Sequence, residues 1–470
     1  MSGIVGFFNV PSPVKKAFFS LYALQHRGQE ACGLYVSDGQ KFRGHREVGL
    51  VPSVLRMSEL DRLSAINPIH AIGQVRSSVA GDPPGLNSEP RHFRHLRAEF
   101  AIASTGGLAN HPELYKSLQE EGAIFQSTSI SEILAHMLVK HRGRMLDALQ
   151  DSLPRMVGGF SFVVMRRNRL YAIRDPHGID PLSIAKLGDG YVIASETCAF
   201  DLLGAKFIRD VAPGEIVEFM GDEMISHTYG EPHRRAVDLM EFVYTARVDS
   251  YIHGVSVYQA RYQSGVELAR ESYVDTDLIV GLPDSSLAGG AGYAAECGVP
   301  HGFGLVKNKY SGRSFIEPTP EDRDRAVYLK LSPVRSILEG KSVTLVDDSI
   351  VRGTTAKRII QMVRNAGARE VHMRIASPRM IAPSFYGMNT PTFNELIANQ
   401  LSTEEIREYV SADSLAFLSI DGLKRAVGLG DDVLDAPWTG NYPTPLFSHT
   451  KYVQNEWEDY INRLGDPSEL

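Results

Sequence analysis

The sequence predicts two domains of different fold class, an α+β sandwich followed by an open α/β sheet. Short apolar strands with few helical patterns between them recur over residues 3–219, which favours stacked sheets with helices outside them. From residue 277 onward, apolar strands alternate with helical patterns, which is typical of a mainly parallel sheet. A chain of 470 residues is long enough for each domain to bury a full core.

The composition is that of an ordinary soluble globular protein, with 43% hydrophobic and 22% charged residues. A formal net charge of −7 argues against a surface that binds nucleic acid. No apolar run reaches the length of a membrane span, and no basic region followed by an apolar core opens the chain. The cysteines, Cys32, Cys198 and Cys297, are too scattered for a disulfide framework or a metal cluster. We therefore expect a cytoplasmic protein with no nucleic-acid or membrane partner.

The N-terminal half begins with the apolar strand Gly3–Val10, so close to the terminus that the first residues are expected to be buried or used. A helix, a polar turn and a strand follow within residues 21–36. A further helix is predicted over Ser131–His141. Further strands are predicted at Ala71–Val75, Phe100–Ala103, Ser161–Met165, Leu170–Ile173, Tyr191–Ala194 and Ile216–Phe219. The polar segment His227–Arg235 is the expected linker, which gives domains of residues 1–232 and 233–470.

The most informative stretch of the C-terminal half is Lys341–Thr355, KSVTLVDDSIVRGTT. Its apolar run predicts a buried parallel strand, which ends in the adjacent carboxylates Asp347 and Asp348. The small-residue turn Arg352–Thr355 then leads into a helical pattern that ends at Gly367. Free backbone N–H groups and hydroxyls at a helix start suit a phosphate monoester, and carboxylates at a strand end suit ribose hydroxyls or Mg²⁺. This order predicts a site for a sugar 5-phosphate.

Three other segments complete the C-terminal half. The strand Asp277–Leu282 ends in the polar turn Pro283–Ser286 before a helix rich in alanine and glycine, and such a turn could hold a pyrophosphate through backbone N–H groups. The segment Asn308–Arg325 is basic and punctuated by glycine and proline, which indicates a loop. A capping box at residues 402–405 and the stretch 411–428 predict C-terminal helices.

Four strings of the sequence together resemble the glutamine 5-phosphoribosyl-1-pyrophosphate (PRPP) amidotransferases, also called amidophosphoribosyltransferases. They are RDPHGIDPL at residues 174–182, GLPDSS at 281–286, KNKYSGRSFIEP at 307–318 and VDDSIVRGTT at 346–355. The likeness extends from residue 3 to about residue 450. It implies an N-terminal-nucleophile glutaminase of the class II glutamine amidotransferases, followed by a type I phosphoribosyltransferase domain. In the family, the segment that matches Asn308–Arg325 closes over bound PRPP and excludes water.

The resemblance also implies roles for residues of the C-terminal half. Asp347 and Asp348 would hold ribose hydroxyls and Mg²⁺, while Asp284 with Ser285 would hold the pyrophosphate and its Mg²⁺. The residues that would hold the 5-phosphate are Ser349, Arg352, Gly353, Thr354 and Thr355. The cations that would steady the departing charge are Lys307 and Arg313. Mg²⁺ is the implied cofactor, and its implied protein ligands are Ser285, Asp347 and Asp348.

The glutaminase half departs from the family pattern at its catalytic positions. The family has a nucleophilic Cys, exposed by removal of Met and activated by its own α-amino group, where this sequence has Ser2, a far weaker nucleophile. The string GHVRYST reads GQVRSSV at residues 73–79, which keeps Arg76. The oxyanion-hole motif HNG reads STG at residues 104–106, and Ile130 replaces the Asp that holds the ammonium group of glutamine.

These substitutions predict a decayed glutaminase, because losing one oxyanion donor alone costs about two to three orders of magnitude in rate. The alternative is a Ser-dependent amidohydrolase with another substrate. Asp180 replaces an expected Arg, and Asn389 replaces the Asp of the family's YGID. No iron–sulphur cluster is expected, because none of the residues at the family's cluster-cysteine positions is a thiol: they are Asp238, Ser384, Leu434 and Pro437.

Together these features predict a phosphoribosyltransferase in which an amine, with ammonia expected, attacks C1 of PRPP as pyrophosphate leaves. With ammonia, the product is phosphoribosylamine, the first intermediate of purine synthesis. Ammonia would come from solution or from a partner protein, and the resemblance implies a homo-oligomer. Two alternatives remain open: an enzyme of specialised metabolism that uses another amine, and a PRPP-binding regulator or subunit that does not catalyse the reaction.

Overall fold

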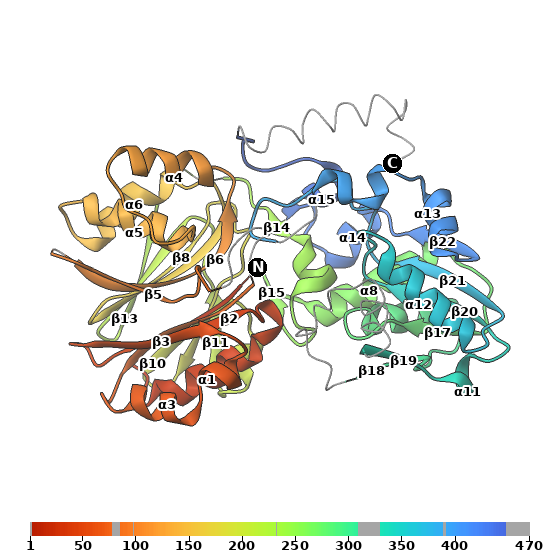
Figure 1. Cartoon of the computed structure of the whole chain (residues 1–470), viewed down its shortest axis with the longest axis horizontal. Helices are drawn as coiled ribbons and strands as arrows, with labels where there is room; N and C mark the ends of the chain where they lie inside the picture. Colours follow the sequence, from red (N-terminus) through yellow and green to blue (C-terminus); the bar gives the residue numbers. More distant parts are fainter. Residues whose placement is uncertain are drawn as a thin grey trace.

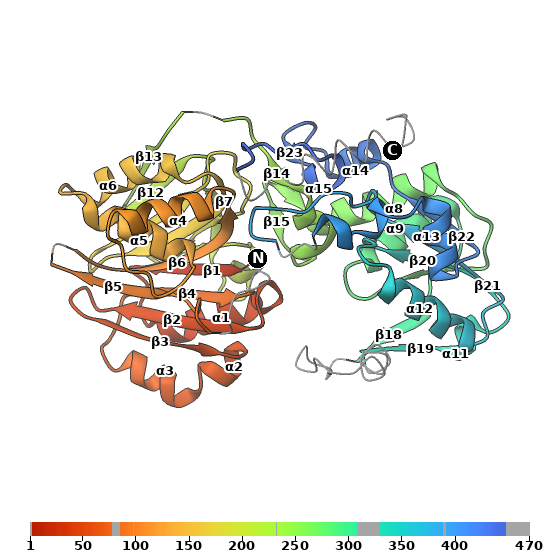
Figure 2. The same cartoon turned by 45° about the horizontal axis from the view of Figure 1, so that its top comes forward.

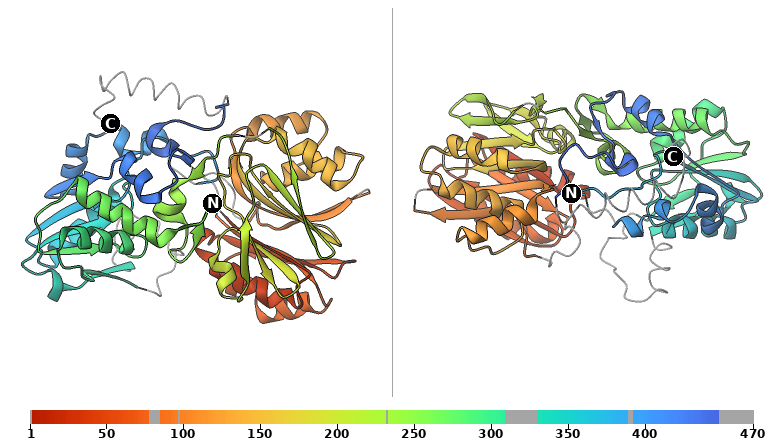
Figure 3. Two further views of the ribbon diagram at one scale, coloured as in Figure 1. Left: turned by 180° about the vertical axis from the view of Figure 1, so that it is seen from behind. Right: turned by 90° about the horizontal axis from the view of Figure 1, so that it is seen from above.

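The computed structural model describes residues 2–77, 85–96, 98–231, 233–308, 330–388 and 392–447. Figure 1 shows two bodies side by side, the N-terminal half in red to yellow and the C-terminal half in green to blue. The start of the chain lies at the boundary between the two bodies in both views of Figure 3. Among the described helices, none is long and apolar enough to cross a membrane.

Two antiparallel sheets stack face to face in the N-terminal domain (Figure 2). The seven-stranded sheet has the order β11-β9-β10-β1-β4-β2-β3, and the six-stranded sheet has the order β13-β12-β8-β7-β6-β5. The strands are β1 (Gly3–Phe8), β2 (Ala31–Ser37), β3 (Phe42–Val48), β4 (His70–Arg76), β5 (Arg91–His95), β6 (Ala98–Leu108), β7 (Gly158–Met165), β8 (Arg169–Arg174), β9 (Ser183–Leu187), β10 (Gly190–Ala194), β11 (Lys206–Asp210), β12 (Glu215–Met220) and β13 (Glu223–Thr228). This arrangement confirms the α+β sandwich.

Helices cover both outer faces of the sandwich. The seven-stranded sheet packs against α1 (Pro13–Ala23), α2 (Val51–Val54), α3 (Met57–Ser64) and α7 (Cys198–Asp201). The six-stranded sheet packs against α4 (His111–Glu120), α5 (Ile130–Lys140), α6 (Met145–Ser152) and the 3₁₀ turn η2 (Leu153–Arg155). Side chains that alternate along each strand fill separate layers: in β1, Ile4 and Phe8 enter the core between the sheets, whereas Val5 and Phe7 enter the core under the helices.

Five strands of this domain have no counterpart in the sequence-based prediction: β3, β5, β9, β11 and β13. Four of them are the edge strands of the two sheets. Their residues are mostly exposed or half-buried, as in β3, whose sequence is FRGHREV. An edge strand needs no continuous apolar run, so the hydrophobic pattern that predicts the central strands is missing there.

The C-terminal domain is built on a parallel sheet of order β17-β20-β21-β22. These strands are β17 (Leu278–Gly281), β20 (Ser342–Asp347), β21 (Glu370–Ile375) and β22 (Ser414–Phe417). One face packs against α8 (Val257–Glu271), α9 (Leu287–Cys297) and α14 (Ile420–Val427). The other face packs against α12 (Thr354–Asn365) and α13 (Thr403–Val410). Helices on both faces of a parallel sheet confirm the α/β class of this half.

Short elements complete the C-terminal domain. Three two-stranded pairs are β14 (Val237–Asp238) with β23 (Val433–Leu434), β15 (Tyr251–Ile252) with β16 (Val255–Ser256), and β18 (Leu305–Lys307) with β19 (Leu331–Pro333). The short helices are the π-helix η3 (Glu241–Thr245), α11 (Arg335–Leu338), η4 (Phe393–Glu395), η5 (Ile397–Asn399) and α15 (Ala436–Thr439).

The prediction of helices over residues 411–428 is wrong in its first part. Residues 414–417 form β22, which pairs in parallel with β21, and only α14 is helical within that stretch. A four-residue apolar run has the same hydrophobic pattern in a buried helix and in a strand, so the open edge of β21 decides the structure. The capping box is present, because Ser402 Oγ accepts from the Glu405 amide at the start of α13.

Buried ion pairs link the two domains. Arg27, in the 3₁₀ turn η1 (Gln25–Arg27), donates to Glu196 at 2.7 Å and to Glu241, in the π-helix of the C-terminal domain, at 2.7 Å. The exposed fraction of each of these three side chains is at most 1%. Arg27 Nε also donates to the backbone carbonyl of Ser2 at 3.0 Å. The first described residue is therefore linked through one guanidinium to the entry of the second domain.

Candidate functional site

Two loops meet at the carboxyl edge of the parallel sheet. β17 and β20 are neighbours, with Gly281 opposite Val346, and the Leu282 amide donates to the Val346 carbonyl at 2.9 Å. Residues 283–286, which follow β17, therefore lie beside the acidic pair that follows β20. Ser285 Oγ donates to Asp348, and Ser286 Oγ donates to Asp347 at 3.3 Å. The structure thus brings together the residues that the sequence assigned to the ribose and pyrophosphate ends of a substrate.

The acidic pair lies in an environment that disfavours negative charge. Burial of the carboxyl group and the neighbouring Asp348 carboxyl raise the pKa of Asp347 well above its ordinary value. Burial also raises the pKa of Asp348, although hydrogen bonds from Ser285 and Ser349 and the nearby Arg261 guanidinium act in the opposite direction. Ser349 Oγ donates to Asp348 at 2.7 Å. A bound cation or hydroxyl donors would relieve the repulsion between these two carboxyls.

The loop after the acidic pair has the geometry of an anion site. Gly353 lies immediately before α12 with φ of 74°, a left-handed conformation that favours glycine. Thr354 and Thr355 form the exposed first turn of α12, where backbone N–H groups have no partner within the helix. The Arg352 guanidinium is directed away, to an ion pair with Glu395 at 2.9 Å. A phosphate at this helix start would meet N–H groups, two hydroxyls and the positive end of the helix dipole.

The predicted basic residues are only partly described. Lys307 ends β18 and forms an ion pair with Asp284, so it lies at the pyrophosphate end of the site. Arg313, and all but the first residue of the segment Asn308–Arg325 predicted to close over substrate, lie outside the described residues. Asn308 and Lys330, the described residues on either side of positions 309–329, are joined by a hydrogen bond, because the Asn308 amide donates to the Lys330 carbonyl at 2.8 Å.

Arg261 lies at the candidate site, although no sequence pattern pointed to it. It is buried on α8, donates to the carbonyls of Phe242 and Ala246 at 2.7 and 2.8 Å, and lines a small cavity together with Ser285 and Asp348. Burial lowers its pKa, while Asp348 acts to raise it. A single arginine in an amphipathic helix carries no local signal, since only the packing of α8 beneath the loops brings it to the acidic pair.

The donor set at the acidic pair fits Mg²⁺ that arrives with a substrate. The described residues contain no group of three or more His, Cys, Asp and Glu side chains that could hold a metal ion by themselves. Asp347, Asp348 and Ser285 nevertheless offer two carboxyls and a hydroxyl at one point. Mg²⁺ is commonly bound through one or two carboxylates together with phosphate oxygens of the substrate, so this arrangement fits a metal shared with a pyrophosphate.

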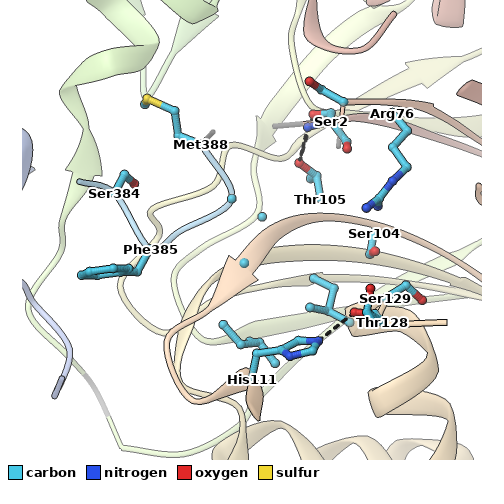
Figure 4. Close-up of a pocket in the computed structure, with 16 residues that line it drawn as sticks. Ser2, Arg76, Ser104, Thr105, His111, Thr128, Ser129, Ser384, Phe385 and Met388 are labelled. Carbon is cyan, nitrogen blue, oxygen red and sulfur yellow. Dashed lines mark hydrogen bonds between the residues drawn. The ribbon is translucent and has the colours of Figure 1, made fainter. Parts of the chain in front are cut away.

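A second candidate site is a cavity of about 280 Å³ around Ser2. Figure 4 shows Arg76, Ser104 and Thr105 on one side of it and Phe385 and Met388, from the C-terminal domain, on the other. The Ser2 amide donates to Thr105 Oγ1 at 3.3 Å, and Thr105 Oγ1 donates to the Ser2 carbonyl at 3.0 Å. The nucleophile position of the predicted glutaminase is therefore at the wall of a cavity between the domains.

The substituted positions form their own hydrogen-bond network behind this cavity. Glu89, fully buried, accepts from the Ser104 amide at 2.9 Å, from Ser104 Oγ at 2.8 Å and from Gln74 at 3.3 Å. Burial raises the pKa of Glu89, while Arg76 and Ser104 act to lower it. Ser104 is thus engaged by Glu89, and Ile130 presents a hydrocarbon side chain to the cavity. No carboxylate lines the cavity among the described residues.

Comparison with known proteins shows the family of this chain. A family profile described as a glutamine amidotransferase domain matches residues 86–201. The amidophosphoribosyltransferase of Staphylococcus aureus (strain COL) is 40% identical over 475 residues, which cover 98% of this chain and 95% of that protein. The amidophosphoribosyltransferase of Bacillus subtilis (strain 168) is 41% identical over 456 residues, which cover 95% of each chain. The chain belongs to the amidophosphoribosyltransferase family. It is therefore an enzyme of the pentosyltransferase class.

Two solved structures share the whole architecture. One is described as the glutamine PRPP amidotransferase of B. subtilis complexed with ADP and GMP; its TM-score is 0.90 at 40% identity, over 95% of this chain and 98% of that one. The other is described as the allosteric regulatory enzyme of purine biosynthesis; its TM-score is 0.91 at 40% identity, over 97% of this chain and 98% of that one. The predicted N-terminal-nucleophile domain followed by a type I phosphoribosyltransferase domain is confirmed.

The residues that the sequence analysis matched to the family's cluster cysteines do not fit an iron–sulphur cluster. Asp238 and Leu434 are paired across β14 and β23, and the Pro437 carbonyl accepts from the amides of Ile381 and Ala382, in the segment that leads to Ser384. The four side chains at these positions are a carboxyl, a hydroxyl and two apolar groups. Such clusters are held by thiolates, which are lacking at these four positions. Asn389 lies outside the described residues.

Proposed function

We propose that this chain transfers an amine, with ammonia as the expected one, to C1 of PRPP. Pyrophosphate is released and phosphoribosylamine for purine synthesis is formed. One observation supports this proposal above all: three features lie together at one edge of the parallel sheet. They are the acidic pair Asp347 and Asp348, the loop that contains Ser285 and Ser286, and the start of α12 after Gly353. The names of the relatives, which are amidophosphoribosyltransferases, support the same reaction.

The phosphate and ribose ends of the substrate have separate partners in this proposal. The helix start at Gly353, with Thr354, Thr355 and Ser349, holds the 5-phosphate, and Arg352 turns from Glu395 toward it. Asp347 and Asp348 accept hydrogen bonds from the ribose hydroxyls, which fixes C1 relative to the incoming amine. Hydrogen bonds of this kind also offset the repulsion that raises the pKa of both carboxyls.

The pyrophosphate end is proposed to lie between the two loops. Asp284 and Ser285 hold this end, and Lys307 with Arg313 stabilises the charge that develops on the leaving group. Asp347, Asp348 and Ser285 are the residues that hold Mg²⁺ together with the phosphate oxygens. When bound, Mg²⁺ would neutralise part of the negative charge of the pyrophosphate. Arg261 positions Asp348 from beneath the loop.

We further propose that the N-terminal domain no longer supplies ammonia from glutamine. Three features support this: the hydroxyl nucleophile Ser2, the engagement of Ser104 by Glu89, and the hydrocarbon of Ile130 at the cavity wall. An alcohol without strong activation is a poor nucleophile, and no side-chain amide donor lines the cavity among the described residues. Ammonia then comes from solution or from an ammonia-supplying protein. The chain is proposed to act as a homo-oligomer.

The test is pyrophosphate release by the purified full-length chain with PRPP and Mg²⁺. Three conditions are compared: ammonium, glutamine and neither. We expect release with ammonium only, and loss of about two to three orders of magnitude in rate for Asp347→Asn, which removes a carboxyl oxygen that accepts from the ribose hydroxyls and holds Mg²⁺. Ser2→Ala is the matched control and should leave the ammonium-dependent rate unchanged.

Each other outcome refutes a defined part of the proposal. Release with glutamine that disappears in Ser2→Ala would show a working glutaminase. Release with another amine and none with ammonium would show a different acceptor. PRPP binding without release under any condition would make the chain a regulator or a subunit of a mixed complex.

A further inference from the structure

The cavity around Ser2 has a lining that is unusual for a site that binds an amino acid. Its cationic or potentially cationic side chains among the described residues are Arg76 and His111, and it has no described carboxylate. Hydroxyls from both domains line the rest of its polar surface: Ser2, Ser77, Ser104, Thr105, Thr128, Ser129 and Ser384. An α-ammonium group in this cavity would lose its hydration without gaining an opposite charge, which is unfavourable.

The charges behind the lining favour an anion. Arg91 interacts electrostatically with the guanidinium groups of Arg46 and Arg76 and with the carboxyls of Glu89 and Glu132, so this set holds three guanidinium groups and two carboxyls. Figure 4 shows the Arg76 guanidinium directed toward Ser104 at the cavity wall. A planar guanidinium matches the geometry of a carboxylate.

The helix at the floor of the cavity adds to this preference. Ser129 is the N-cap of α5, an 11-residue helix, and Ile130 is its first residue. Since Ser129 and Ile130 both line the cavity, the positive end of the α5 dipole lies next to it. Glu132, in the first turn, is occupied by hydrogen bonds from Ser127 and from the Gln126 amide at 2.7 Å. Burial acts to raise the pKa of Glu132, but hydrogen bonds from His136, Ser127 and the Gln126 amide hold it below its ordinary value, so this carboxylate stays ionised and is engaged by those donors.

The remaining wall is apolar and comes from both domains. Ile130 and Leu108 contribute hydrocarbon from the N-terminal domain, and Phe385 and Met388 contribute an aromatic ring and a thioether from the C-terminal domain. A volume of about 280 Å³ is at the lower end of small-molecule pockets and restricts the occupant to a few carbons and a head group. The occupant must therefore combine one anionic end with a short apolar or amide-bearing body.

We propose that this cavity binds a small carboxylate that lacks an ammonium group, with its carboxylate at Arg76 and its body against Ile130 and Phe385. The proposal does not depend on the reaction at the other site. Because Ser384, Phe385, Gly387 and Met388 of the C-terminal domain line the cavity, an occupant contacts both domains at once. The cavity should therefore prefer a carboxylate without an ammonium group, which is the opposite of the preference of a glutamine site. An ammonium group beside the Ile130 side chain would lose its hydration and gain no ion pair.

Two probes that differ only in the ammonium group test this proposal. L-glutamine and glutaramate, which is glutamine without its α-amino group, are titrated calorimetrically into the full-length chain. We expect glutaramate to bind at least about tenfold more tightly than L-glutamine. Arg76→Met should weaken glutaramate binding by about tenfold or more, because a charge-assisted hydrogen bond is lost. Arg94→Met, which removes an exposed arginine of the edge strand β5 in the other sheet, is the matched control and should leave both affinities unchanged.

A second variant, which adds a negative charge to the cavity, tests the proposal even if Arg76→Met does not fold. Ile130→Asp places a carboxylate at the cavity wall, so we expect the preference to move toward L-glutamine. Equal affinities for the two probes, tighter binding of L-glutamine by the unmodified chain, or no heat from either probe at millimolar concentration would each overturn the proposal. An unchanged preference in a folded Ile130→Asp variant would overturn the assignment of the ammonium position.

Discussion

Replacing Arg27 by Met should destabilise the contact between the two domains. The Arg27 guanidinium lies between Glu196 and Glu241, at 2.7 Å from each, and all three side chains are buried. Met has a similar apolar stem but no charge, so Arg27→Met leaves two carboxyls without their shared counter-charge. Glu196 keeps hydrogen bonds from His26 and Ser250 at 2.7 Å, whereas Glu241 has no other ion-pair partner among the described residues.

The expected loss is about 3 to 5 kcal/mol in the free energy of unfolding, which is typical when one partner of a buried ion pair is removed. The pKa values agree with a strongly interacting group. Burial acts to raise the pKa of Glu196, but His26 and Arg27 hold it well below its ordinary value. In Arg27→Met, Glu241 must either take up a proton or remain charged in a buried position, and both are unfavourable at neutral pH.

Urea unfolding followed by far-ultraviolet circular dichroism at pH 7 measures the loss. Arg94→Met is the control, because that side chain is 79% exposed and its pair with Glu99 should contribute at most about 1 kcal/mol. In a double-mutant cycle, Glu241→Gln added to Arg27→Met should recover at least about 1 kcal/mol of the predicted loss. The reasoning is refuted if Arg27→Met is no more destabilising than the control.

Two further predictions concern the pH dependence of stability and the phosphate loop. Burial raises the pKa of Asp180 to about 7, so the stability that its protonated form provides is lost as pH rises from about 4 to 7. Asp180→Asn should therefore gain about 1 to 4 kcal/mol over the parent at pH 8 and less at pH 5, measured by urea unfolding; a pH-independent difference would contradict this. Gly353→Ala should raise the KM for PRPP, because a Cβ there lies 2.8 Å from Ile397 Cδ1, and should cost about 1 to 2 kcal/mol of stability from its positive φ. Gly340→Ala, with φ of 75° and open space around its Cβ, should share the stability cost without the change in KM, and equal KM values for the two variants would contradict the phosphate role.

Much of the fold follows from local sequence patterns. The central strands of both domains, such as β7 and β20, were predicted because they are buried on both faces and are therefore continuously apolar. The edge strands were missed because half of their residues face solvent and the pattern is diluted. β22 was assigned to a helix, since four apolar residues do not distinguish the two structures until the edge of β21 is available to pair with them.

The residues of the candidate sites likewise fall into those that local sequence predicts and those that it does not. Asp347, Asp348 and the turn to Gly353 are contiguous in the chain, so their order alone predicted a phosphate and ribose site. Arg261 was not predictable, because it reaches Asp348 from a helix 87 positions earlier in the chain. Ser2, Glu89 and Ser104 likewise show no relation in the sequence, although the structure joins them around one cavity wall.

The sequence by itself determined the family and the two fold classes, because short contiguous strings and local hydrophobic patterns encode them. It also predicted the acidic phosphate-loop motif, whose residues are contiguous, and a decayed glutaminase from the residues at positions 2, 104–106 and 130. Only the tertiary structure decided which loops share the sheet edge, how Arg27 joins the domains and that the altered positions enclose a cavity without a described carboxylate. These features depend on strand order and domain packing, which bring distant residues within hydrogen-bond range and remove them from water. Burial then gives the same side chains different charges and partners from those they would have in the unfolded chain.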